Sequence, residues 1–203
     1  MLKEKEQKTL TKKENKTTAV LKEILSFVLT FVLTFAAYKA TFTYVLENSV
    51  VEGCSMEPTL HEEDRLISTK ILYTPKQEDI IIIDSGKLQK KIVKRVVATE
   101  GQVVDIDFET GKVYVDGCEL NEQLYSKGAE LTADYFVNTL TTRNMGAFDS
   151  YPLTVPEGYI FVLGDNRNSS LDSKSGMLGF VPTDEVLGKV LMRVRPLSDL
   201  TLF

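Results

Sequence analysis

Residues 24–46 read ILSFVLTFVLTFAAYKATFTYVL and contain one charged residue, Lys39. A helix of this length reaches roughly 34 Å, which is enough to cross a hydrocarbon core of about 30 Å. No A-x-A cleavage site follows the apolar run, so the segment is not typical of a removed signal peptide. Lys39 lies near the far end, where a lysine can extend to the membrane interface. The stretch therefore predicts one N-terminal transmembrane helix, an anchor at residues 23–46.

The segments on the two sides of this anchor differ in charge. Residues 1–22 contain seven lysines against three acids, a balance of +4, whereas the remainder carries −9 and the whole chain −5. The lysine-rich, apolar-poor composition predicts a disordered tail. By the positive-inside rule this tail stays in the cytoplasm. We therefore expect a single-pass protein of the cell membrane, with residues 47–203 forming an extracytoplasmic domain.

The outer part contains short runs rich in Ile, Val and Leu, separated by turn residues, as is typical of strands. The runs are residues 65–73, 80–83, 91–98, 102–107, 112–115, 159–163 and 186–194. Neither a helical period nor an alternation of helix and strand follows residue 47, which argues against a parallel α/β sheet. The pattern predicts an all-β domain, barrel-like or a folded-over sheet, with a hairpin at 107–112. Residues 121–154 are polar and aperiodic and are interpreted as an excursion from this core.

The composition argues against several classes of function. The acidic balance opposes nucleic acid as a partner, since nucleic-acid binding needs a basic face. One histidine, His61, and two cysteines, Cys54 and Cys118, are too few for a structural zinc site with about four ligands. We expect neither a metal nor a cofactor. Whether the two cysteines pair stays open at this point.

Two segments contain candidate catalytic groups. In residues 53–60, GCSMEPTL, Ser55 precedes a proline that interrupts the strand direction, so the serine can present its hydroxyl. The alternative is an ordinary turn serine. In residues 91–98, KIVKRVVA, strand alternation makes Lys94 the one polar side chain on an otherwise apolar face.

An apolar environment disfavours the ammonium form of Lys94. Its pKa is then expected to fall from about 10.4, which makes the lysine a candidate general base. The alternative is a lysine that extends to solvent at a sheet edge or pairs with a carboxylate. A third segment, residues 164–176, reads GDNRNSSLDSKSG. Its polar side chains either bond their own backbone or support the catalytic groups.

Together the three segments resemble the bacterial type I signal peptidases, which are membrane-anchored serine proteases with a Ser/Lys dyad. SMEPTL matches the family's S-M-x-P-T-L box, KRVV its K-R-V/A box, and GDNRNSSLDSKSG is similar to its G-D-N-R-x-x-S-x-D-S-R box. The boxes follow in the family's order behind the anchor, and the short insertion resembles a Gram-positive type. The resemblance implies an all-β catalytic domain of coiled antiparallel sheets.

The resemblance also implies roles for single residues. Ser55 would be the nucleophile, Lys94 the general base and Ser170 the hydroxyl that orients the lysine. Three further residues would hold the loop by ion pairs, namely Arg95, Asp165 and Asp172. Four would line shallow pockets for small substrate residues at −1 and −3, namely Val51, Met56, Leu60 and Val93. The backbone N–H of Ser55 would serve as an oxyanion donor, whereas Gly53 replaces the serine that supplies a second donor in Gram-negative members.

Several positions depart from the family's pattern. Residues 98–102, ATEGQ, stand where G-L-P-G-D is usual, so that Glu100 replaces a proline. Cys54 replaces a common Asp or Gly, Asn168 an Asp, and Lys174 an Arg. A point ammonium cannot reproduce a bidentate guanidinium pair, so Lys174 changes how the loop is held. These departures bear on the rigidity of the site.

The leading hypothesis is a serine endopeptidase that removes signal peptides from exported preproteins at small-x-small sites. Its partners would be preproteins and the lipid bilayer, and we expect it to act as a monomer. The alternatives are a specialised paralogue for a few substrates such as pilus subunits, a related Ser/Lys autoprotease, and a catalytically idle, membrane-tethered module that binds precursors. A Cys54/His61 nucleophile pair is disfavoured, since adjacent strand residues point in opposite directions.

Overall fold

The computed structural model describes residues 2–71, 73–107, 110–121, 148, 150–167, 169–196 and 199–203, with the backbone alone for residues 2–17. Contacts within the chain divide it into two compact units, Met1–Tyr44 and Val45–Phe203. Most of the predicted excursion, residues 122–147 and 149, lies outside the described residues. Each unit is described below by itself.

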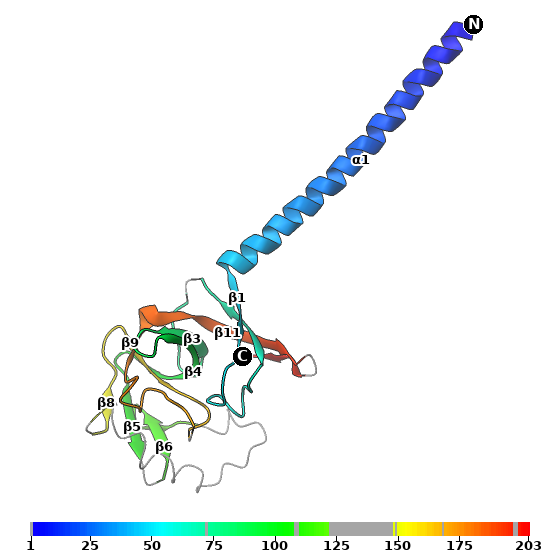
Figure 1. Ribbon diagram of the computed structural model, residues 1–203. Coiled ribbons are helices and arrows are strands. Elements are labelled where there is room, and N and C mark those ends of the chain that lie inside the picture. The colour runs from blue at the N-terminus through cyan, green and yellow to red at the C-terminus, as the bar shows by residue number, and fades with distance from the viewer. Residues whose placement is uncertain are drawn as a thin grey trace. The chain divides into compact units, whose positions relative to one another are not determined.

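The first unit is one long helix, α1, which spans Leu2–Tyr44 (Figure 1). The expectation of a disordered tail is wrong for its backbone, because Lys, Glu, Gln and Leu are strong helix formers and extend the apolar helix toward the N-terminus. Thr18–Tyr44 comprises 27 residues, contains an 18-residue window with a mean hydropathy of 1.9, and is long and apolar enough to cross a membrane. The helix ends before the predicted anchor boundary at residue 46, because Leu46 already begins a strand.

The second unit consists of two antiparallel sheets (Figure 1). The larger has the strand order β1-β2-β11-β3-β4-β9-β10, with β12 paired to β11. Its strands are β1 (Leu46–Val50), β2 (Arg65–Thr69), β3 (Ile80–Ser85), β4 (Lys90–Thr99), β9 (Tyr159–Leu163), β10 (Val181–Pro182), β11 (Val186–Arg195) and β12 (Thr201–Leu202). The smaller has the order β7-β6-β5-β8. Its strands are β5 (Val103–Asp107), β6 (Lys112–Val115), β7 (Cys118–Glu119) and β8 (Leu153–Thr154). A 3-10 turn, η2 (Thr183–Glu185), precedes β11.

The structure confirms the all-β prediction, and each of the seven predicted runs contains a strand. The run 65–73 was predicted too long, because β2 ends at Thr69. β5 and β6 pair with Asp107 opposite Lys112, as the expected hairpin requires. The two-residue strands were missed because they are too short to show an alternation. One of them, β8, comprises the last two residues of the predicted excursion and pairs with β5.

Two features of the larger sheet determine where the site lies. The first is the end of a strand pairing: β9 pairs with β4 only from Arg95 onward, so the preceding part of β4 is bonded to β3 alone. The second is an apolar cluster beneath the segment that follows β1. Val51, Met56, Leu60, Leu66, Ile80, Ile82 and Val190 form this cluster. Burial of a large apolar side chain stabilises a fold by about 1.5–3 kcal/mol, so the segment is held firmly against the sheet.

We predict that residues 45–203 fold without α1, because the three apolar clusters of the domain are made from residues of this unit alone. The shortened chain is expected to show a single cooperative thermal transition and a near-ultraviolet circular dichroism spectrum with fixed aromatic bands. A broad transition without near-ultraviolet signal would show that the domain depends on the helix.

Candidate active site

Ser55 lies in the turn between β1 and β2. Gly53 adopts a left-handed φ of +78°, which turns the chain away from the β1 direction at little cost for a glycine. The N–H of Glu57 donates to the carbonyl oxygen of Cys54 at 3.1 Å, and the next residue after Ser55, Met56, is 1% exposed. Because Met56 is anchored in the core, the side chain of Ser55 is directed away from it and stays partly accessible.

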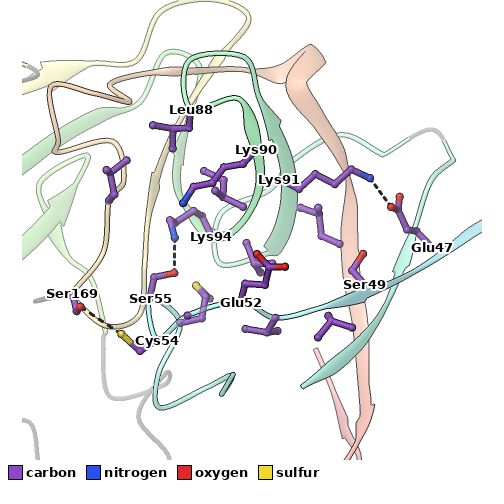
Figure 2. Close-up of a pocket in the computed structure, with 18 of the residues that line it drawn as sticks. Glu47, Ser49, Glu52, Cys54, Ser55, Leu88, Lys90, Lys91, Lys94 and Ser169 are labelled. Atoms are coloured by element: carbon purple, nitrogen blue, oxygen red, sulfur yellow. Dashed lines mark hydrogen bonds and ion pairs between the residues drawn. The ribbon is translucent and has the colours of Figure 1, made fainter. Parts of the chain in front are cut away.

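The amine of Lys94 lies next to this hydroxyl. Nζ of Lys94 donates to Oγ of Ser55 at 2.7 Å, and Figure 2 shows the two side chains pointing toward one another from β4 and from the turn. Lys94 is 3% exposed and is the last residue of β4 before the pairing with β9 begins. Two chemically complementary groups, 39 positions apart in the chain, are thus in direct contact.

Burial controls the charge of Lys94. Loss of water around the amine lowers its pKa from the ordinary value of 10.5 to about 8. The carboxylate of Asp172 is the largest effect in the opposite direction, while the ammonium groups of Lys174 and Lys90 lower the pKa further. A large fraction of the amine is therefore uncharged in mildly alkaline solution, as a general base requires.

Arg95, the neighbour of Lys94, binds the loop that follows β9. Its Nε and Nη2 donate to the two carboxylate oxygens of Asp165 at 2.8 and 2.6 Å, and its Nη1 donates to the carbonyl oxygen of Glu78 at 2.9 Å. Oγ1 of Thr59 donates to the same carboxylate at 2.6 Å. Asp165 thereby joins β4, the loop and the segment that carries Ser55. The structure brings together Arg95 and Asp165, as the sequence predicted.

Asp172 is held by a different cation. Nζ of Lys174 donates to both of its carboxylate oxygens, at 3.0 and 2.9 Å, and the N–H of Gly164 donates to one of them at 3.0 Å. Both side chains are almost completely buried. The lysine that replaces an arginine therefore still neutralises Asp172, although through one nitrogen. Removing one member of such a buried pair typically costs about 3–5 kcal/mol, because the other charge is left unpaired.

Ser170 is placed differently from the prediction. Its Oγ is buried and has no hydrogen-bond partner among the described residues, so the structure does not show the expected contact with Lys94. The hydroxyl lies instead against Gly164. A Cβ at position 164 would be 2.2 Å from Oγ of Ser170 and 2.4 Å from the carbonyl oxygen of Ser55. Position 164 must therefore lack a side chain.

Asn166 was not predicted, although it connects the loop directly to the segment that contains Ser55. Its backbone N–H donates to the carbonyl oxygen of Ser55 at 3.1 Å, and its Nδ2 donates to the carbonyl oxygen of Cys54 at 3.1 Å. Thr59 was missed in the same way. Both residues lie inside the quoted motifs, Asn166 directly after Asp165 and Thr59 four residues after Ser55, and these positions were the available signal.

A cleft of about 660 Å³ opens beside Ser55 and Lys94 (Figure 2). Its walls are mainly residues 47–56, which include most of β1, and residues 90–94 of β4, with Ile82, Leu88, Ser169 and Leu171 completing the lining. Val51, Met56 and Val93 contribute to the lining, and their role as pockets for small substrate residues stays a prediction. The prediction for Leu60 is not supported, because this side chain is fully buried in the apolar cluster and is not among the described residues that line the cleft.

The cysteines and the histidine make other contacts. Cys54 and Cys118 are both free and exposed, and Sγ of Cys54 donates to Oγ of Ser169 at 3.4 Å. The backbone N–H of His61 donates to the carboxylate of Asp64 at 2.9 Å. No interaction joins Cys54 to His61 within the described part of the chain. The same residues contain no group of three or more His, Cys, Asp or Glu side chains suited to a metal ion.

Gly164→Ala is expected to destabilise the domain by about 1–3 kcal/mol, the usual cost of forcing extra atoms into a packed region. The added methyl group would clash with both the side chain of Ser170 and the backbone of Ser55. Urea denaturation of both proteins measures the difference in the free energy of unfolding. Gly86→Ala is the matched control, since its Cβ would meet only the flexible end of Glu185, at 3.2 Å. Equal stabilities of the two variants would contradict the close approach at Gly164.

Comparison with known proteins places this chain in a family. The family model described as signal peptidase, peptidase S26, matches residues 24–195. Signal peptidase I of Bacillus licheniformis is 34% identical over 156 residues, which cover 71% of this chain and 74% of the relative. Signal peptidase I T of Bacillus subtilis strain 168 is 34% identical over 148 residues, covering 71% and 72%. A crystal structure of a signal peptidase I from Enterococcus faecalis V583 shares 30% sequence identity, covers 58% of this chain and 97% of its own, and has a TM-score of 0.41. Because the family model spans most of the chain, the protein belongs to the signal peptidase family, peptidase S26.

Proposed function

We propose that this signal peptidase cleaves peptide bonds with Ser55 as nucleophile and Lys94 as general base. The observation that carries the proposal is the 2.7 Å contact between Oγ of Ser55 and the buried Nζ of Lys94. An alcohol is a weak nucleophile unless a base accepts its proton, and a lysine can do so only when it is uncharged. Burial lowers the pKa of Lys94 to about 8 and so provides that form near neutral pH.

The reaction proceeds in two stages in which Lys94 carries the proton. Oγ of Ser55 attacks the scissile carbonyl carbon while its proton passes to Nζ of Lys94. The C–N bond then breaks, and Lys94 gives this proton to the departing amine, which leaves an ester between Ser55 and the acyl half of the substrate. Lys94 next takes a proton from a water molecule that attacks the ester carbonyl. The proton returns to Ser55 as the ester bond breaks.

The negative charge that forms on the carbonyl oxygen needs donors. We assign the backbone N–H of Ser55 to this role, because no acceptor for it lies among the described residues and it belongs to the attacking residue itself. One well-placed donor contributes about 3–4 kcal/mol to the stabilisation of the transition state. Gly53 has no side chain to act as the second donor.

The substrates proposed are preproteins that carry a small residue at −1 and at −3 from the cleavage site. Val51, Met56 and Val93 present apolar surface to the cleft next to the reacting pair, which suits small apolar side chains. Val51 and Met56 are also part of the packed core. Because they cannot move aside without opening the core, large substrate side chains are excluded by shape.

The proposed location follows from α1. Thr18–Tyr44 would be a membrane anchor and residues 45–203 the catalytic domain. The lysine-rich segment before the anchor supports a cytoplasmic N-terminus, which places the domain on the outer side. The bilayer and a preprotein would then be its partners, and a single copy of the chain would contain the complete site.

Ser55→Ala is expected to abolish cleavage of a labelled preprotein by the detergent-solubilised full chain. Lys94→Met, which preserves the buried volume, should lower kcat/KM by about 10²–10⁴, the usual contribution of a general base. Thermal unfolding of each variant controls for loss of structure. Near wild-type turnover by either variant would contradict the dyad.

Two further outcomes would favour the alternatives. Loss of cleavage in Cys54→Ser would indicate that the thiol is the nucleophile. A wild-type protein that binds the preprotein without cleaving it would instead support a binding module.

The activity is expected to rise with pH through about 8. Below the pKa of Lys94 the fraction of uncharged amine, and hence kcat/KM, grows tenfold per pH unit, and above it the activity reaches a plateau. A pH profile of kcat/KM measures this inflection. An inflection near 6.5 would indicate a histidine and contradict Lys94 as the base.

A further inference from the structure

A second lysine of β4 is directed at the reacting pair. Lys90 lies four residues before Lys94, and side chains with this spacing project from the same face of a strand. Both lysines line the cleft, and Figure 2 shows the amine of Lys90 pointing toward that of Lys94. Lys94 is buried, whereas Lys90 is exposed. The cleft therefore holds a second lysine that faces the proposed base.

Lys90 also differs from its neighbour Lys91 in having no ion-pair partner in the part of the chain that the structure describes. Nζ of Lys91 donates to the carboxylate of Glu47 at 2.8 Å, so its charge is compensated by β1. For Lys90, no carboxylate among the described residues forms an ion pair, and no acceptor binds its amine. Glu52 also brings a carboxylate to the same cleft, but it forms no ion pair with Lys90.

The other charged groups around Lys94 form ion pairs, in which each charge is compensated by one of opposite sign. The loop after β9 presents Asp172 with its partner Lys174, and Asp165 with its partner Arg95. β3 presents the uncharged Ile81 opposite Lys94, and the turn after β1 presents the Ser55 hydroxyl. Among the described groups that act on the charge of Lys94, Lys90 is the one without an ion-pair partner.

We propose that Lys90 is a positioning residue of this site, whose fixed positive charge disfavours the ammonium form of Lys94 and so keeps the base ready to accept the Ser55 proton. The inference rests on the proposed function, in which Lys94 is the base. Lys90 lowers the pKa of Lys94, in keeping with repulsion between two cations. A peptide bound in the cleft would remove water from between the two amines and strengthen the repulsion.

The test compares pH profiles of the full chain in detergent at low salt, with a preprotein substrate. Lys90→Met is expected to raise the inflection of kcat/KM by about 0.3–0.5 pH unit, a roughly two- to threefold loss at pH 7 relative to its own alkaline plateau. Lys90→Glu should double the shift, and Lys90→Arg should restore the wild-type value. The shift in kcat, which reports the substrate complex, should exceed that in kcat/KM.

The matched control removes the neighbouring ion pair with the double substitution Glu47→Gln and Lys91→Met. It takes away two opposite charges from the same cleft and is expected to leave the inflection in place, whatever its effect on KM. About 1 M salt, where the Debye length is about 3 Å, should bring the Lys90→Met and wild-type inflections together.

The inference is overturned if the Lys90→Met and Lys90→Glu profiles superimpose on the wild type, or if Lys90→Arg shifts as far as Lys90→Met. Failure of the proposed function looks different. A wild-type protein that does not cleave the substrate, or whose pH profile has no inflection near 8, would contradict Lys94 as the base. If the wild-type inflection lies near 8 but does not shift when the charge at position 90 is changed, only the role of Lys90 is contradicted.

Discussion

The exclusion of water from one amine is the constraint on which the rest of the site depends. The pKa of Lys94 is about 8 in the folded chain and 10.5 for an ordinary lysine, so folding at neutral pH works against this group by about 3 kcal/mol. The unfolded chain binds more protons between these two values, so the cost declines as pH rises from 8 to 10.5. Because typical domains are stable by only about 5–15 kcal/mol, the apolar clusters beneath the site have to offset a substantial penalty.

The architecture meets this constraint by ending one strand pairing at the right residue. β9 accompanies β4 only as far as Arg95, so the edge of β4 at Lys94 is left for the Ser55 segment. Arg95 turns to the opposite face and binds Asp165 of the loop that follows β9. One strand therefore supplies the proposed base with one residue and fastens the surrounding loop with the next, which is a direct use of strand alternation.

Much of this arrangement could be predicted from the sequence, and the exceptions have physical reasons. The isolation of Lys94 among apolar residues predicts its burial, since periodicity reports the environment of a strand residue. Leu60 was assigned to a pocket although it lies in the core, because an apolar side chain in a turn shows no period that separates the two. Asn166 was missed because its backbone N–H is one of its donors to the Ser55 segment, and a main-chain contact leaves no trace in residue type. The prediction for the lysine-rich tail was wrong because its high charge indicates disorder, whereas the helix propensity of its residues favours a helix.

The hydrogen bonds from Asn166 to the carbonyl groups of Cys54 and Ser55 have a consequence for how substrate meets the enzyme. They restrict the backbone of Ser55, the proposed nucleophile, before any peptide binds. The loss of conformational freedom is thus incurred once, when the chain folds, and is not repeated at each encounter. When a peptide binds, only the peptide loses conformational freedom. More of its binding energy then remains for lowering the activation barrier of cleavage.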